Sequence, residues 1–158
     1  GTCVLSIYLD GKLQKSWNIE VTSDDQNWLV YDAWLNSVIK DIQSSGSWDN
    51  ADPIHKVTLV GQYILDNYDY DSDPMSAFHV NGKGNCNASA SILADVATRL
   101  NLRAEVINPK ALASSAPGHV VAKIWYNGRI YHLDAGYEGK APRGNVQVVS
   151  WDANDYDG

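Results

Sequence analysis

Residues 82–100 begin with Gly82-Lys83-Gly84-Asn85-Cys86-Asn87-Ala88, in which a glycine-flanked cysteine precedes a helical pattern of apolar residues. The apolar residues that share one helix face are Ala88, Ile92, Val96 and Leu100. The first turn of a helix offers unpaired N–H groups and the positive end of the helix dipole, and both favour a thiolate over a thiol. The stretch therefore places Cys86 where a cysteine can react. Unpaired cysteines are also among the most buried residues, so from this stretch alone a purely structural role stays open.

The composition is that of a folded chain. The sequence has 158 residues, 44% of them hydrophobic and 20% charged, with six Trp and nine Tyr, which predicts one globular domain rather than disorder. The net charge of −7, without a run of Lys or Arg, argues against nucleic acid and anionic membranes as partners. No stretch is long and apolar enough to predict a membrane span.

The two cysteines, Cys3 and Cys86, occur without a CxxC motif or a Cys/His spacing typical of metal ligands. A Cys3–Cys86 disulfide stays open as an alternative. Two acidic segments, 66–73 and 152–157, lack the ligand spacing of an EF-hand loop, so we interpret both as solvated loops. We predict neither a metal nor a cofactor.

The only methionine is Met75, so we expect that the chain does not begin at a translation start and that Gly1-Thr2 is the edge of a processed piece. Few basic residues, almost no cysteine and many Asn, Asp, Ser, Trp and Tyr are typical of exported bacterial proteins. We therefore expect an extracellular or cell-surface location, with the signal peptide outside this chain.

The first part of the chain predicts a hairpin and two helices. Asp10-Gly11 separates two strand-like runs, 3–9 and 12–21, as in a two-residue β-turn. Apolar residues spaced by three and four predict a helix over 24–43, and Asp52-Pro53 is a typical start for a second helix ending near Asn67. We expect residues 1–22 to be a hairpin extension and residues 23–158 to be a single catalytic domain.

The strongest local signal is a second hairpin. Its strands, 119–126 and 129–134, flank Asn127-Gly128, the pair that favours a two-residue turn. A two-residue turn fixes the register, so Val121 lies opposite Asp134 in the predicted pairing. Beyond this hairpin we expect a last strand over 146–151, and before it a strand over 103–107 and a loop over 108–118.

The register places a histidine next to an aspartate. His119 and Val121 share a face of their strand, and Asp134, opposite Val121, shares it too. His119 and Asp134 then become diagonal neighbours with Cβ atoms about 7–8 Å apart. Asp134 would orient the imidazole, and the other ring nitrogen would hold the proton of a thiol. Gly136, opposite His119, is expected to leave room for a substrate or a third residue.

Two other histidines compete for this role. His132 points to the same strand face but lies beside Lys123, whose charge disfavours an imidazolium, so we prefer His119. His79 lies seven residues before Cys86 and is a candidate for lining the cleft, although a loop contact is the simpler interpretation.

The order of Cys86, His119 and Asp134, with their neighbouring motifs, resembles the transglutaminase-like superfamily over residues 54–140. The segments that carry the resemblance are Asn67-Tyr68-Asp69-Tyr70-Asp71, Gly84-Asn85-Cys86, Asn101-Leu102-Arg103-Ala104, His119-Val120-Val121 and Arg129-Ile130-Tyr131-His132-Leu133-Asp134-Ala135. The resemblance implies an α+β, papain-like core in which a nucleophile helix packs against an antiparallel sheet. It also implies that Cys86 is the nucleophile, His119 the base and acid, and Asp134 the orienting residue.

Two positions differ from the family's usual pattern. Val121 stands where the family usually has an aromatic residue, two positions after the histidine, and Asn85 precedes the cysteine. We take Asn85 and Val121, together with Tyr70 upstream, as candidate substrate-binding or oxyanion-binding residues.

The expected activity is acyl transfer from a glutamine carboxamide or peptide amide of a protein or peptide substrate, through a thioester on Cys86. Two alternatives stay open at this point. The same triad serves a cysteine peptidase or amidase that uses water as acceptor, and the same fold serves as a non-catalytic extracellular binding module.

Overall fold

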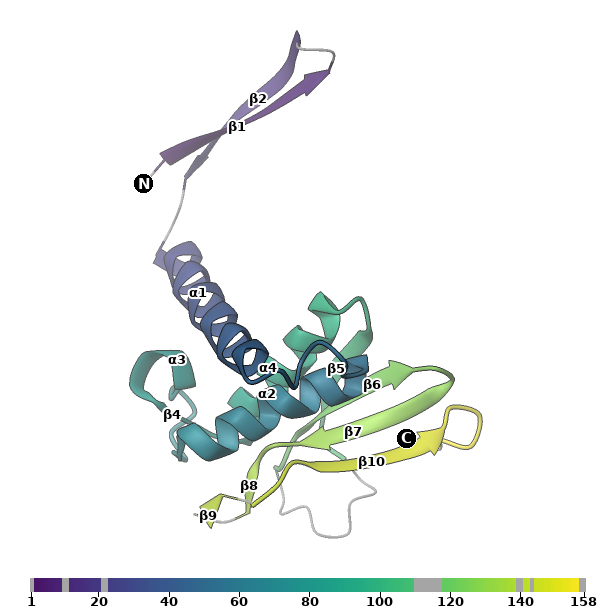
Figure 1. The fold of residues 1–158 in the computed structure, drawn as a ribbon. Coiled ribbons are helices and arrows are strands. Elements are labelled where there is room, and N and C mark those ends of the chain that lie inside the picture. The colour runs from purple at the N-terminus through teal and green to yellow at the C-terminus, as the bar shows by residue number, and fades with distance from the viewer. Residues whose placement is uncertain are drawn as a thin grey trace. The chain divides into compact units, whose positions relative to one another are not determined.

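The computed structural model describes residues 2–9, 12–20, 23–109, 118–138, 141–142 and 144–156. The chain divides into two compact units, residues 1–37 and 38–158, which we describe separately (Figure 1). The expected boundary at residue 22 and the single catalytic domain after it stay predictions.

The first unit contains the predicted hairpin. Strands β1 (Thr2–Leu9) and β2 (Lys12–Glu20) pair antiparallel, with Leu9 opposite Lys12, and a bulge shifts the register between Ile7 and Tyr8. This confirms the two strands, while the turn at Asp10-Gly11 lies outside the described residues.

Helix α1 (Ser23–Ser44) begins in the first unit and confirms the helix predicted over 24–43. Its apolar face is unevenly covered. Leu35 is fully buried, whereas Trp28, Leu29 and Val30 near the start of the helix are more than half exposed. Amphipathic spacing therefore predicted the helix correctly but not which of its turns are covered.

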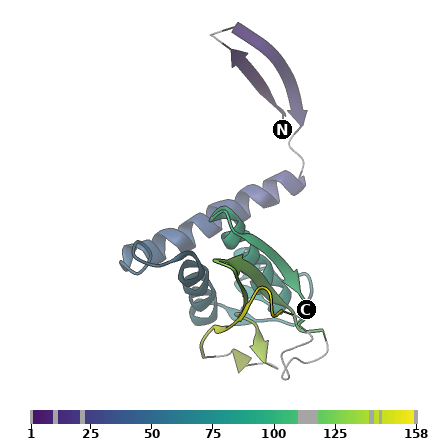
Figure 2. The same ribbon diagram turned by 90° about the vertical axis from the view of Figure 1, so that its right-hand side faces the viewer.

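The second unit contains two long helices, α2 (Pro53–Asn67) and α4 (Cys86–Arg99), both close to their predicted bounds. The N-cap Asp52 accepts a hydrogen bond from the backbone N–H of His55 at 2.9 Å, as its position before Pro53 predicts. Helix α4 contacts both α2 and the sheet, and Figure 1 and Figure 2 show the two helices on the same side of the sheet. Leu93, Val96 and Ala97 are buried in this layer.

The sheet has four antiparallel strands in the order β10-β7-β6-β5. The strands are β5 (Arg103–Ile107), β6 (Val121–Tyr126), β7 (Arg129–Asp134) and β10 (Gln147–Asp152). Helices packed on an antiparallel sheet confirm the predicted α+β class. Most of the predicted loop 108–118, from 110 to 117, lies outside the part of the chain that the structure describes.

The second hairpin has the predicted register. Tyr126 pairs with Arg129 and Lys123 with His132, and both turn residues, Asn127 and Gly128, adopt positive φ values of 48° and 71°.

The start of this hairpin differs from the prediction. Strand β6 begins at Val121, so His119 precedes the strand instead of lying in it. After β7 the Asp134 carboxylate accepts a hydrogen bond from the Gly136 N–H at 2.7 Å, which curls the chain and ends the ladder. Gly118, with φ of 90°, turns the chain immediately before His119.

Four short strands and one short helix complete the unit: β3 (Asp69–Tyr70), α3 (Phe78–Asn81), β4 (Lys83–Gly84), β8 (Tyr137–Glu138) and β9 (Ala141–Pro142). Strands β3 and β4 pair parallel, which brings Tyr70 beside Gly84, two residues before Cys86. None of the helices in the described ranges is long and apolar enough to cross a membrane.

The acidic loop between β3 and α3 is held by its own side chains. Asp71 accepts hydrogen bonds from the Asp73 N–H at 3.0 Å and the Ser76 hydroxyl at 2.7 Å. These bonds, the backbone one first, lower the pKa of the Asp71 carboxyl. The Asp73 carboxylate in turn accepts from the Met75 N–H at 2.9 Å, so the carboxylates of this segment order the loop itself.

Candidate active site

Cys86 is the first residue of α4 and carries a free, half-buried thiol. The alternative of a Cys3–Cys86 disulfide is therefore wrong for this structure. Asn85 is the N-cap, and its side-chain oxygen accepts hydrogen bonds from the N–H groups of Asn87 and Ala88, both at 3.0 Å. The cap leaves the N–H of Cys86 itself without an acceptor among the described residues.

The segment before Cys86 is held from two sides. The Asn85 amide donates to the carbonyl of Asp73 at 3.3 Å, and the ring of Phe78 fills the space that a side chain at Gly84 would need. Glycine at position 84 is therefore required for close packing against the Phe78 ring. This role of Phe78 was not predicted, and the one signal for it in the sequence is that Phe78 is the single phenylalanine of the chain.

His119 and Asp134 form the predicted pair. Nε2 of His119 lies 2.8 Å from Oδ2 of Asp134, and the two side chains are only 8% and 2% exposed. The second carboxylate oxygen, Oδ1, accepts a hydrogen bond from the Gly136 N–H. Both oxygens of Asp134 thus have defined partners, which fixes the carboxylate that orients the imidazole.

Cys86 meets this pair at Gly136. A Cβ atom at Gly136 would lie 2.6 Å from Cε1 of His119 and 3.1 Å from Cβ of Cys86. The helix start and the hairpin end, more than thirty residues apart in sequence, therefore converge on one point. The room that we expected at Gly136 is filled by these two side chains.

The hydrogen-bond pattern decides which nitrogen of His119 can act as a base. An ionised carboxylate only accepts hydrogen bonds, so Nε2 carries the proton in the bond to Asp134. Nδ1 is then the nitrogen with a free lone pair in the neutral ring, and no hydrogen bond to it is formed within the described ranges. Cε1 of His119, to which Nδ1 is bonded, and Cβ of Cys86 both border the space beside Gly136.

His132 belongs to a different cluster. Its Nε2 is hydrogen-bonded to the Tyr156 hydroxyl at 3.0 Å, and its ring packs edge-on against Trp151. Burial, and then the charge of Lys123, lowers the pKa of His132 to about 4. The His132 ring is thus neutral and buried, and its hydrogen-bond partner lies outside the Cys86 region, which is consistent with the preference for His119.

His79 is half-buried on α3, where burial lowers its pKa, and its place in the cleft stays a prediction.

The other three candidate residues have different surroundings. Asn85 is the N-cap, Tyr70 lies beside Gly84 through the β3–β4 pairing, and Val121 is completely buried at the start of β6. Val121 therefore lies in the protein core and not at the molecular surface. Roles of all three in substrate or oxyanion binding stay predictions.

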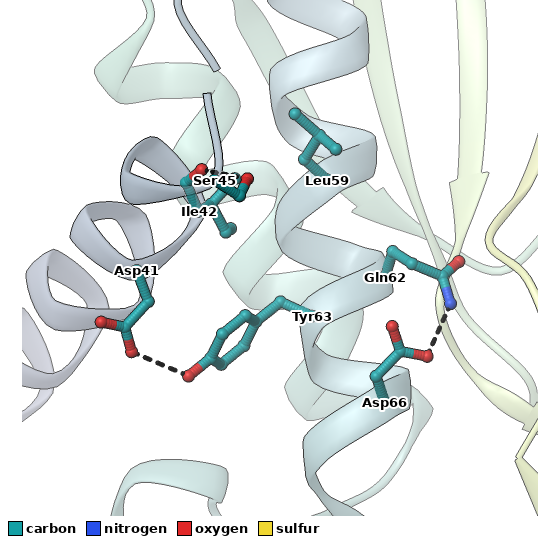
Figure 3. A pocket seen from close by; sticks show the side chains of 7 residues that line it. All are labelled: Asp41, Ile42, Ser45, Leu59, Gln62, Tyr63 and Asp66. Carbon is teal, nitrogen blue, oxygen red and sulfur yellow. Dashed lines mark hydrogen bonds between the residues drawn. The ribbon is translucent and has the colours of Figure 1, made fainter. Parts of the chain in front are cut away.

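A surface pocket lies elsewhere, between the end of α1 and α2 (Figure 3). It is lined by Asp41, Ile42, Ser45, Leu59, Gln62, Tyr63 and Asp66. The Tyr63 hydroxyl donates to Asp41 at 3.1 Å, and burial, followed by this bond, raises the pKa of Tyr63. No candidate catalytic residue lines this pocket.

In the part of the chain that is described, no group of three His, Cys, Asp or Glu side chains is arranged to hold a metal ion.

Comparison with known proteins gives a structural neighbour. No family model matches the sequence, and no curated protein matches it significantly. The chain is similar to the crystal structure of a TGase, with a TM-score of 0.52 and 20% sequence identity. The similarity covers 77% of this chain and 36% of that chain, so this chain spans about a third of its neighbour. At 20% identity the similarity shows the fold alone, which is transglutaminase-like.

Proposed function

We propose that the chain is a cysteine acyltransferase of the transglutaminase type, acting on a glutamine carboxamide of a protein or peptide. The observation that carries the proposal is the convergence of Cys86 and the hydrogen-bonded pair His119–Asp134 at Gly136. The transglutaminase-like fold supports it. A cysteine at a helix start, with a histidine near it just before a strand, also suits thiol chemistry.

The first step transfers an acyl group to the enzyme. Nδ1 of His119 takes the proton of the Cys86 thiol, and the thiolate attacks the carboxamide carbon to form a carbon–sulfur bond. When the tetrahedral intermediate collapses, the carbon–nitrogen bond breaks and His119 returns the proton to the leaving nitrogen. Ammonia leaves, and the acyl group remains as a thioester on Cys86.

The oxyanion of this intermediate needs hydrogen-bond donors. The N–H of Cys86 suits this role, since the Asn85 cap satisfies the next two N–H groups and not this one. The position at the start of α4 adds the positive end of the helix dipole. Tyr70 remains our candidate for a second donor.

The second step releases the acyl group. A primary amine attacks the thioester carbon and passes a proton to His119, and the carbon–sulfur bond breaks to restore the thiol. Asp134 holds the imidazole in the tautomer that each proton transfer requires. We also propose that the protein acts outside the cell, with a lysine side chain or a small amine as the acceptor.

The experiment is incorporation of a fluorescent primary amine into dimethylated casein by the wild-type chain, with Cys86→Ala as the inactive variant and Cys3→Ala as the matched control. We expect incorporation by the wild type and by Cys3→Ala and none by Cys86→Ala. Ammonia release without incorporation would replace the proposal by an amidase, and new peptide N-termini by a peptidase. Absence of all three products from the folded wild type would favour a binding module.

A further inference from the structure

We propose that Gly136 is a positioning residue of the active site: its lack of a side chain allows the side chains of His119, Asp134 and Cys86 to converge at one point. The inference rests on the proposed function for its catalytic meaning. The predicted effect of Gly136 on the geometry of Cys86, His119 and Asp134 depends on packing alone.

The backbone at Gly136 does not itself require glycine. Positive φ values occur at Gly118 and Gly128, where a side chain would be strained, but Gly136 lies outside that region. Alanine can adopt its backbone conformation, so space is the remaining constraint on this position.

That space is taken by all three members of the proposed triad. A Cβ at Gly136 would lie 2.6 Å from Cε1 of His119, 2.8 Å from Oδ1 of Asp134 and 3.1 Å from Cβ of Cys86. Ordinary contacts of a Cβ lie at 3.4–4 Å. To accept a methyl group, the His119 ring would have to retreat by roughly 1 Å, a displacement that alone can cost about 100-fold in rate.

The clash falls on side-chain atoms, which can move without disrupting the sheet. His119 and Asp134 are nearly buried, so the ring can retreat only by leaving its bond to Asp134 or its approach to Cys86. The Gly136 N–H would still be available to Oδ1 of Asp134, which keeps the chain reversal after β7. We therefore expect Gly136→Ala to fold while the triad loses its alignment.

The test compares Gly136→Ala with Gly61→Ala. Gly61 is a matched control because a Cβ there would crowd the half-buried Val146 and the buried Ala135 and Leu93, none of which is a triad member. In amine incorporation we expect Gly136→Ala to lower kcat about 100-fold with little change in KM, and Gly61→Ala to lower Tm while keeping the kcat of the folded fraction. A wild-type kcat in Gly136→Ala would overturn the proposal.

A second measurement needs no substrate. The rate of iodoacetamide alkylation at Cys86 reports its pairing with His119, and we expect Gly136→Ala to slow it. If the wild type incorporates no amine but Gly136→Ala still slows alkylation, the proposed function fails and the positioning role stands. If the wild type is active and both variants alkylate at its rate, the positioning role fails and the function stands.

A double variant covers the case in which Gly136→Ala does not fold. In a His119→Ala background the closest clash is absent, so adding Gly136→Ala should lower Tm less than it does in the wild type. Recovery of folding in the double variant would support the proposal. An equal loss of stability in both backgrounds would overturn it.

Discussion

Nε2 of His119 and Oδ2 of Asp134 lie 2.8 Å apart although 15 residues separate them in the sequence. The Asn127-Gly128 turn brings them together, because it folds β7 back along β6 in a fixed register. Burial keeps water from competing for this hydrogen bond. The pair is therefore a buried, defined contact of the candidate active site and the first target for mutation.

Asp134→Asn should lower amine incorporation by about 10²–10⁴-fold with little change in Tm. Asparagine keeps an oxygen for the Gly136 N–H, but it presents an NH₂ group to Nε2 of His119, which favours the wrong tautomer. The measurement is kcat for incorporation together with the thermal transition.

Asp95→Asn is the matched control for this change. It removes the same charge from the surface of α4, where Asp95 pairs with Arg99 at 3.0 Å, and surface pairs of this kind contribute little. Equal rates for Asp134→Asn and Asp95→Asn would contradict an orienting role for Asp134.

Asn85→Ala should lower the free energy of unfolding by about 1 kcal/mol, because α4 loses the cap of two N–H groups. Asn85→Ser should restore most of this loss, since serine is also a good N-cap. Urea denaturation of the three proteins measures the effect. A serine variant as unstable as the alanine variant would show that the cap is not what stabilises this helix start.

Gly84→Ala should destabilise the protein by about 1–3 kcal/mol, because its methyl group would occupy the space of the Phe78 ring. Gly144→Ala is the control, since no atom of the described residues lies within 4 Å of a Cβ at that position. The prediction is wrong if the two variants unfold at the same urea concentration.

Stability should fall on acidification because of His132. Its pKa is lowered from 6.5 to about 4 by burial and then by Lys123, so the unfolded chain binds this proton more readily than the folded one. The contribution is complete above about pH 6.5 and is lost as the pH falls toward 4, by up to about 3 kcal/mol. Denaturation curves across this range measure it.

His132→Gln tests the assignment of this pH dependence. Glutamine keeps a polar group for the Tyr156 hydroxyl but does not titrate, so the loss of stability between pH 6.5 and 4 should shrink. His55→Gln, at an exposed position, should leave the pH dependence unchanged. The same slope in wild type and His132→Gln would assign the effect to other groups.

Local sequence signals predicted much of this architecture. Asn127-Gly128 fixed the register of β6 and β7, and Asp52-Pro53 marked the start of α2, because turns and caps depend on residues close in sequence. The pairing of His119 with Asp134 follows from that register, although His119 itself lies just before the strand.

Contacts between distant segments could not be predicted from local sequence signals. The crowding of Gly136 by Cys86 depends on how α4 packs on the sheet, and the packing of Phe78 on Gly84 depends on the short β3–β4 pairing. The Tyr156 partner of His132 comes from the end of the chain. Neither periodicity nor turn chemistry contains such information.

In the proposed mechanism His119 activates Cys86. The most direct test is the rate of iodoacetamide alkylation at Cys86, resolved from Cys3 by peptide mass spectrometry, at about pH 6, where an ordinary cysteine is almost entirely protonated. We predict rapid alkylation in the wild type and a loss of at least about 10-fold in His119→Asn, with the fold retained. Equal, slow alkylation of Cys86 in both proteins would contradict the claim.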